Sequence, residues 1–258
     1  MEWRFIDTGY DAFYNMAVDE ALMQLSSIPT IRFYRWKPAA LSIGYFQDIK
    51  AGINYENCKK YGIDVVRRIT GGKAVLHDKE VTYSIVADES LMPKGIIESY
   101  KRVSSGIVIA LRQMGIDTKM EESANIRQKS AICFNEPSYY ELTVNGKKIA
   151  GSAQTRKNKK LLQHGSILID IDFDKIFSVF GIDGEDKKIS IKNRITSINN
   201  ELKRKITCDE VKAALKNGFE ENFGVKLKKS ELTEKEEELA NRLIKEKYST
   251  DNWNLINN

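Results

Sequence analysis

The chain has few of the residues from which metal and disulfide sites are built. Its 258 residues include three cysteines and two histidines. Cys58, Cys133 and Cys208 lie far apart and in no C-x-x-C pair, which excludes a disulfide framework and a zinc ribbon. Two histidines are too few for a multi-histidine metal centre. We therefore expect free thiols and no bound metal.

Long apolar runs are also missing. No stretch approaches the roughly 20 apolar residues that a membrane-spanning helix needs, and the opening MEWRFIDTGYDAFYNM contains no signal-peptide core. We expect a cytoplasmic protein without a membrane partner. The net charge is +5, with basic residues spread among 36 acidic ones, which argues against nucleic-acid binding. A mild positive balance is compatible with an acidic protein partner.

Apolar periodicity and capping signals predict four helices. Residues at helical spacing cover 11–25, with Asp19 and Glu20 on another face, and again 96–114. Capping boxes, in which threonine precedes glutamate by three residues, predict two further helix starts: Thr207 with Glu210, and Thr233 with Glu236. The carboxy-terminal quarter is therefore expected to be helical.

Extended runs predict a sheet between these helices. IRFYRW and LSIGYF are expected to form neighbouring strands, followed by KAVLH, EVTYSIVAD and LLQHGSILID. Asn145-Gly146 lies between ELTV and KKIAGSAQ and predicts a hairpin, because this dipeptide tolerates the positive φ values of a type I′ turn. The order predicts an α+β protein with a mixed β-sheet flanked by helices.

The segment RRITGGKAVLHD places two arginines before Gly71 and Gly72. Backbone without side chains lets a ligand approach closely, although a simple tight turn has the same composition. The segment is neither a P-loop nor a dinucleotide-binding fingerprint. His77 is the next-to-last residue of this segment and His164 lies in QHGS, both beside glycine-containing strand ends. The two histidines are candidates for the lining of one cleft, or for ordinary structural roles.

A second group of residues is CFNEPSYYELTVNGKKIAGSAQTR, in which Cys133 precedes the hairpin that carries Lys148. A nearby ammonium lowers the pKa of a thiol from ~8.5, and the thiolate attacks thioesters. A buried inert cysteine and a solvated lysine are the more common fates of these residue types. Residue types alone therefore leave both interpretations open. Cys58 and Cys208 have no such neighbours, and we expect them to be inert.

Taken together, RRITGGKAVLHD, ELTVNGKKIAGSAQTR and LLQHGSILI resemble the lipoate-protein ligase, biotin ligase and octanoyltransferase superfamily. The resemblance implies a catalytic domain of this type over 27–240, within one globular unit of 1–258 that ends in a short helical segment. ATP-dependent ligases of the superfamily usually carry an Arg-Asn-Asp type segment where this chain has AICFNEPSYYEL, and often an accessory domain for which the helical tail is too short. Cysteine followed by phenylalanine is typical of its octanoyltransferases.

The resemblance also implies the site. Cys133 matches the nucleophile that forms an acyl-cysteine, and Lys148 matches the lysine that lowers the nucleophile's pKa, with no ATP or other cofactor. The acyl-binding loop and the pocket walls match two sets of residues: Arg68, Gly71, Gly72 and His77, and Gly151, Ser152, Gln154, His164 and Gly165.

The implied reaction moves an octanoyl group from acyl carrier protein to a lysine of a lipoyl carrier protein. The acceptor is the glycine-cleavage carrier protein, or the lipoyl domain of an oxoacid dehydrogenase. Three alternatives stay open: an ATP-dependent lipoate-protein ligase, an octanoyl amidotransferase between lipoyl carrier domains, and a carrier-binding module without activity.

Overall fold

The structure is a computed structural model that describes residues 2–48, 52–122 and 140–255. Its strands form a larger sheet in the order β11-β1-β2-β6-β10-β9-β8-β7 and a smaller one in the order β4-β3-β5. In the larger sheet β1 pairs in parallel with β11 and β2, whereas the pairs from β2 to β7 are antiparallel. The strands are β1 Glu2–Asp7, β2 Thr30–Tyr34, β3 Ala40–Ile43, β4 Asp64–Arg67, β5 Val75–His77, β6 Glu80–Asp88, β7 Lys119–Glu122, β8 Tyr140–Val144, β9 Lys147–Lys157, β10 Lys160–Leu168 and β11 Lys226–Lys229.

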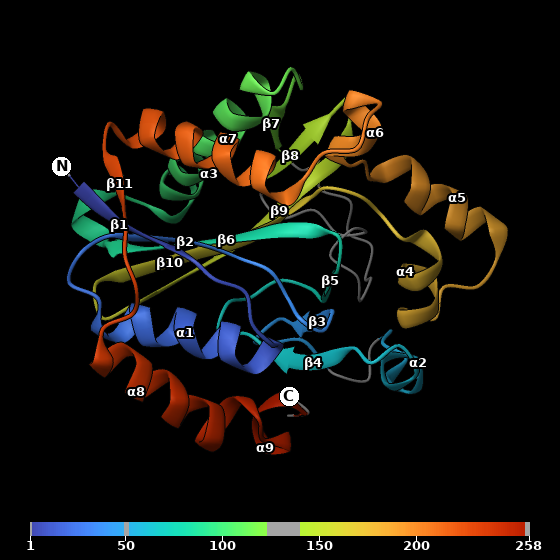
Figure 1. Ribbon diagram of the computed structural model, residues 1–258. Helices are drawn as coiled ribbons and strands as arrows, with labels where there is room; N and C mark the ends of the chain where they lie inside the picture. The colour runs from blue at the N-terminus through green and yellow to red at the C-terminus, as the bar shows by residue number, and fades with distance from the viewer. Residues whose placement is uncertain (1, 49–51, 123–139, 256–258) are drawn as a thin grey trace.

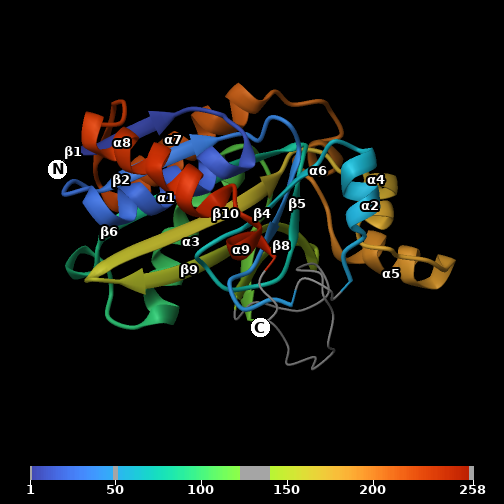
Figure 2. The same cartoon turned by 90° about the horizontal axis from the view of Figure 1, so that it is seen from below.

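Helices cover both faces of the larger sheet (Figure 1). α3 (Ile96–Gln113) and α7 (Cys208–Phe223) pack together on one face, and α1 (Ala12–Leu25) and α8 (Glu234–Leu243) on the other. α2, α4 and α5 gather next to the smaller sheet, at the end of the molecule away from α1 and α8 (Figure 2). The remaining elements are α2 Tyr55–Lys60, α4 Phe173–Val179, α5 Glu185–Arg194, α6 Ile198–Leu202, α9 Asp251–Asn254, a 3₁₀ turn at Glu89–Leu91 and a π-helical turn at Ile244–Tyr248. The predicted fold class, a mixed sheet flanked by helices, is confirmed.

Three apolar clusters hold these layers together. One joins the larger sheet to α3 and α7 and includes Phe219, and a second joins it to α1 and α8 around Leu22. The third lies between the smaller sheet and α2, α4 and α5, and includes Phe177 and Cys58. The smaller sheet therefore packs on two sides, because Ala40 of β3 and Val66 of β4 also belong to the second cluster.

The predicted helix starts and the hairpin are confirmed. The carboxylate of Asp11 accepts a hydrogen bond from the backbone N–H of Tyr14 at 2.8 Å, and both capping boxes of α7 and α8 are closed. Asn145 and Gly146 have φ values of 51° and 73°, as a type I′ turn requires. Asp19, which the spacing places on a different face from the apolar residues, is nevertheless only 1% exposed and points into the protein.

The predicted pairing of the first two extended runs is wrong. β2 lies between β1 and β6 in the larger sheet, whereas β3 lies between β4 and β5 in the smaller one. Every residue of both strands is buried, so the local pattern cannot indicate a partner. Helices α2, α4, α5 and α6 and strands β1, β7 and β11 were not predicted. β11 lies inside the quarter that we expected to be helical, and only its Leu227 is buried.

Candidate active site

A cavity of about 190 Å³ lies between the two sheets. β9 and β10 form one wall, and β5 with the 68–73 loop forms the opposite one. Apolar atoms dominate its surface, from side chains that include Val75, Ala150, Ala153 and Leu168. The space is smaller than the roughly 300–1,000 Å³ of a drug-sized ligand pocket, and its size and apolar lining suit a small apolar group.

Backbone contact fixes the glycine loop that forms one wall. A Cβ atom on Gly44, at the end of β3, would lie 1.8 Å from the carbonyl oxygen of Gly72. Gly72 itself has a φ of 94°, which disfavours any other residue. The Arg68 guanidinium lies inside the turn and donates to the carbonyls of Gly71 and Lys73 at 2.9 and 2.8 Å. Arg68 and Gly72 line the cavity, whereas Gly71 does not.

Arg67, next to Arg68, ties this region to distant parts of the chain. Its guanidinium donates to three carbonyls of the 44–47 turn at 2.8, 3.0 and 2.8 Å. Its backbone N–H donates to the side chain of Asn254 at 2.9 Å, and the Trp253 indole donates to its carbonyl at 2.8 Å. The loop before the cavity is thereby held by residues nearly 190 positions later in sequence.

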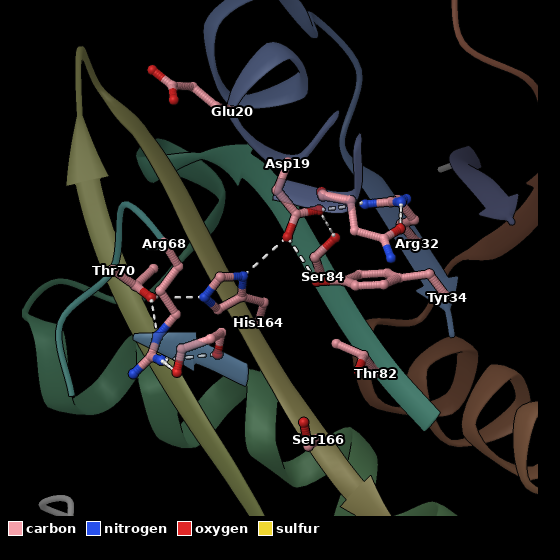
Figure 3. A network of polar contacts seen from close by, with 12 residues as sticks. Asp19, Glu20, Arg32, Tyr34, Arg68, Thr70, Thr82, Ser84, His164 and Ser166 are labelled. Carbon is pink, nitrogen blue, oxygen red and sulfur yellow. Dashed lines mark hydrogen bonds and ion pairs between the residues drawn. The ribbon is translucent and has the colours of Figure 1, made fainter. Parts of the chain in front are cut away.

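His164 on β10 connects the cavity to a buried charged network (Figure 3). Its Nδ1 lies 3.0 Å from a carboxylate oxygen of Asp19, and its Nε2 lies 2.7 Å from the hydroxyl of Thr70. Arg68 in turn donates from Nε to the Thr70 hydroxyl at 3.1 Å. Asp19 also pairs with the Arg32 guanidinium at 2.9 Å. A continuous chain of hydrogen bonds therefore runs from α1 to the glycine loop.

The charges in this network follow from burial and from the partners. Burial opposes ionisation of Asp19, but the hydrogen bond from His164 and the Arg32 guanidinium outweigh it and lower the pKa of Asp19. Burial lowers the pKa of His164, which Asp19 offsets only in part. Asp19 is therefore ionised beside a neutral His164. Because a carboxylate can only accept, Nδ1 carries the proton and Nε2 accepts from Thr70.

His77 on β5 stands in a similar arrangement on the other side of Arg68. Its Nδ1 donates to Glu80 at 2.6 Å, and its Nε2 lies 2.7 Å from the Ser42 hydroxyl, which accepts from Arg68 at 3.0 Å. The ring stacks on Trp36 at 4.0 Å with an interplanar angle of 12°. Both histidines line the cavity, which confirms that they share one cleft.

Lys148 enters the same cavity from β9. The side chain is 4% exposed, and Nζ donates to a carboxylate oxygen of Glu141 at 2.7 Å. Gly151 makes room for it, since a Cβ atom there would lie 2.9 Å from Lys148 Cε. A Cβ atom on Gly165 would lie 2.4 Å from the Gly151 carbonyl oxygen. These two glycines allow β9, β10 and the lysine to pack closely.

Ser152 and Gln154 differ in what they contact. Ser152 lines the cavity, and its hydroxyl lies 2.7 Å from the Tyr83 hydroxyl. Gln154 does not line the cavity: its amide donates to Gln163 at 2.9 Å and its carbonyl accepts from Ser99 of α3 at 3.1 Å. The structure thus places Gln154 towards α3, away from the pocket wall to which the resemblance assigned it.

The proposed nucleophile, Cys133, lies outside the described residues. The two described cysteines do not line the cavity. Cys58 is buried in the core of the smaller sheet, and burial raises its pKa to about 11. Burial also raises the pKa of the half-buried Cys208. Both thiols are therefore protonated at neutral pH and fit the inert role expected of them.

Sequence reasoning missed four polar residues that hold the site together: Asp19, Ser42, Thr70 and Glu80. Sequence reasoning gave none of them a role in the site, although Thr70 lies within RRITGGKAVLHD and Asp19 lies on the first helix. Their unusual feature is burial with a polar partner, which only the tertiary structure shows.

Across the described residues no group of three or more His, Cys, Asp or Glu side chains is arranged to hold a metal ion. No helix of the described ranges is long and apolar enough to cross a membrane.

Comparison with known proteins places this site in a family. The chain is 45% identical to octanoyltransferase LipM of Halalkalibacterium halodurans, covering 98% of both chains. It is 43% identical to octanoyltransferase LipM of Bacillus subtilis, covering 98% of this chain and 97% of the relative. A crystal structure of lipoate-protein ligase A bound with ATP superposes with a TM-score of 0.84 at 29% identity, covering 99% of each chain.

A further solved structure is that of a bipartite lipoate protein ligase from Thermoplasma acidophilum, studied with its E2 lipoyl domain. It matches with a TM-score of 0.83 at 28% identity, over 100% of this chain and 98% of that one. The family model described as the lipoyl protein ligase A/B catalytic domain matches residues 11–220. The chain belongs to the lipoyl protein ligase A/B catalytic domain family.

Proposed function

We propose that this chain transfers an octanoyl group from acyl carrier protein to a lysine of a lipoyl carrier protein, through an acyl intermediate on Cys133. The chain is an acyltransferase of protein lipoylation. The observation that carries the finer proposal is the buried Lys148 ammonium in the wall of an apolar cavity. A cation there stabilises a thiolate and developing negative charge, at the place where an acyl chain fits.

The proposed chemistry has two balanced steps. In the first, the Cys133 thiolate attacks the octanoyl carbonyl, the bond to the carrier sulfur breaks, and the Lys148 ammonium gives its proton to the leaving thiolate. In the second, the amine of the acceptor lysine attacks the acyl-cysteine, the bond to Cys133 sulfur breaks, and neutral Lys148 takes the proton from the amine. Cys133 and Lys148 return to their starting forms, and ping-pong kinetics follow.

The cavity supports an acyl substrate of limited length. Its walls are mainly apolar, and burial of each methylene contributes ~0.8 kcal/mol. Gly151 and Gly165 keep β9 and β10 free of side chains where the lysine enters. We propose that the octanoyl chain lies along this wall, with its carbonyl towards Lys148.

The partners in this proposal are an acyl carrier protein as donor and a lipoyl carrier protein as acceptor, with the glycine-cleavage carrier as the preferred candidate. The T. acidophilum ligase was studied with its E2 lipoyl domain, which supports a lipoyl-domain acceptor for a chain of this fold. Cytoplasmic action, the 27–240 domain bounds and independence from a cofactor stay predictions.

The rival function is ATP-dependent lipoate ligation, which the likeness to ATP-bound lipoate-protein ligase A favours. The expected lack of an accessory domain does not weigh against it, because the T. acidophilum ligase chain is matched over 98% of its length. The octanoyltransferase relatives are more similar, at 45% identity against 29%. An octanoyl amidotransferase is told apart by its donor, which would be a carrier domain, and a binding module by the absence of any acyl adduct.

The deciding experiment is the intact mass of the protein after mixing with octanoyl-acyl carrier protein in the absence of ATP. We expect the wild type and Cys208→Ala, a matched cysteine control, to gain one hydroxylamine-sensitive octanoyl group. Cys133→Ala should gain none, with transfer to the lipoyl carrier falling by at least about 10³-fold. An adduct on Cys133→Ala, or product only with ATP and free acid, contradicts the proposal.

A further inference from the structure

Three features of the hairpin hold Lys148 in one place. A bulge between Leu142 and Thr143 shifts the β8–β9 register, and bulges next to active sites commonly redirect a side chain. The backbone carbonyl of Lys148 accepts from the Thr196 N–H at 2.9 Å, so the segment after α5 holds the strand from the other side. The side chain then passes over Gly151, where any Cβ would collide with it. The lysine is therefore preorganised before any substrate arrives.

The charge of this buried lysine needs a partner. Burial of an ammonium favours loss of its proton, and an opposite charge within ~4–6 Å favours keeping it. The Glu141 carboxylate supplies that charge at 2.7 Å from Nζ, across the hairpin and diagonal to the pair Thr143 and Lys148. The side chain of Glu141 is itself 19% exposed, so its carboxylate stays in contact with solvent while it pairs with the lysine.

We propose that Glu141 is a positioning residue of the acyl transfer, which holds Lys148 protonated and aimed along the cavity wall until a thioester occupies the site. This inference rests on the proposed function of Lys148 but concerns a residue that the mechanism does not otherwise use. Glu141 does not line the cavity and acts only through the lysine.

Other charged groups lie around the pair, and the test must distinguish their effects on Lys148 from the effect of Glu141. On β7, Glu121 is directly opposite Glu141 in the sheet register, and it is exposed. Across the cavity, Arg68, Lys73 and His77 contribute to the lining. His164, on β10, belongs to the wall that carries Lys148. Arg194 precedes Ile195, whose backbone bridges to Lys148. Glu121→Gln is the matched control, because it removes one carboxylate from the same sheet edge without touching the lysine.

The first measurement is the titration of Lys148 itself, by NMR of protein with ¹³C-labelled lysine, with the signal assigned by its loss in Lys148→Arg. We expect the pKa of Lys148 to fall by about one to three pH units in Glu141→Gln, to recover in part in Glu141→Asp, and to stay unchanged in Glu121→Gln. An unchanged pKa in Glu141→Gln overturns the inference, whatever the protein is found to catalyse.

The second measurement is the rate of Cys133 acylation against pH. In our proposal the rate falls on the alkaline side as Lys148 loses its proton, so Glu141→Gln should move this midpoint to lower pH by the same amount as in the titration. If wild type forms no acyl adduct, the proposed function fails while the titration still decides the ion pair. If wild type is acylated and Glu141→Gln has the wild-type pH profile, Glu141 has no part in the reaction.

Discussion

The two histidines of the cavity stand in arrangements that match almost atom for atom, yet their charges are balanced differently. Each has a carboxylate at Nδ1 and a hydroxyl at Nε2, and Arg68 donates to both hydroxyls. We call each histidine, together with its carboxylate and its hydroxyl, an arm. In the His164 arm, the Asp19 carboxylate also accepts hydrogen bonds from Arg32, Tyr34 and Ser84. In the His77 arm three donors share one oxygen of Glu80, whose other oxygen has no partner among the described residues.

This difference indicates separate roles for two similar triplets. The His164 arm is a saturated network, anchored in α1 and the larger sheet by a buried ion pair. The His77 arm joins His77 and Ser42 of the smaller sheet to Glu80 of β6, and this carboxylate has no arginine partner in the described structure. We infer that the His164 arm fixes the larger sheet against the glycine loop, while the His77 arm tolerates adjustment.

The largest expected effect separates the two carboxylates. Asp19→Asn leaves the Arg32 guanidinium buried without its counter-charge and should lower the free energy of unfolding by about 3–5 kcal/mol. Glu80→Gln keeps an acceptor for His77 and should cost only about 1–2 kcal/mol. Urea unfolding at pH 7 measures both. Equal losses in the two variants would remove the distinction between the arms.

The next effect concerns the residue that the two arms share. Arg68→Lys keeps the charge but lacks the planar fork that reaches Ser42, Thr70 and the loop carbonyls together, so we expect a loss of about 1–3 kcal/mol. The KM for octanoyl-acyl carrier protein should also rise, because the loop loses its shape. Arg242→Lys, at an exposed position, is the control and should change stability by less than about 0.5 kcal/mol. A wild-type KM in Arg68→Lys would show that the loop keeps its shape without the fork.

The smallest effect is a pH dependence that belongs to His164. Its folded pKa lies below the unfolded value of about 6.5, so the unfolded chain takes up a proton first as the pH falls. Stability should therefore decrease below about pH 6.5, at up to ~1.4 kcal/mol per pH unit, until the folded pKa is reached. The low pKa of Asp19 acts only at still lower pH. His164→Gln should flatten the dependence of the unfolding free energy on pH between pH 6.5 and 5, as measured by urea unfolding. An unchanged slope would show that another group causes this dependence.

Much of the fold follows from local sequence. The Asn145-Gly146 hairpin, the capping boxes of α7 and α8, and helix α3 are each specified within a few residues, and the structure has all of them. The partner of β3 and the strand β11 could not be predicted. Their pairing is set by burial against distant elements, and β11 has little apolar pattern of its own.

The site was predictable to the extent that motifs mark it. Lys148, Arg68, both histidines and most of the glycines were expected in one place, and they surround one cavity. Asp19 was predicted only to lie off the apolar face of its helix, and the local sequence did not indicate that it is buried. Its burial depends on Arg32 and His164 arriving from two other elements, which no local pattern contains.

The attachment of Arg67 to Trp253 and Asn254 has a consequence for how the protein is made. A ribosome synthesises the glycine loop early and the residues that lock it nearly 190 positions later. In the same way, β1 can pair with its neighbour β11 only after residues 226–229 have been synthesised. The contacts that tie Arg67 to α9 can therefore form only after residue 254 has left the ribosomal exit tunnel, so this part of the structure is completed late in synthesis.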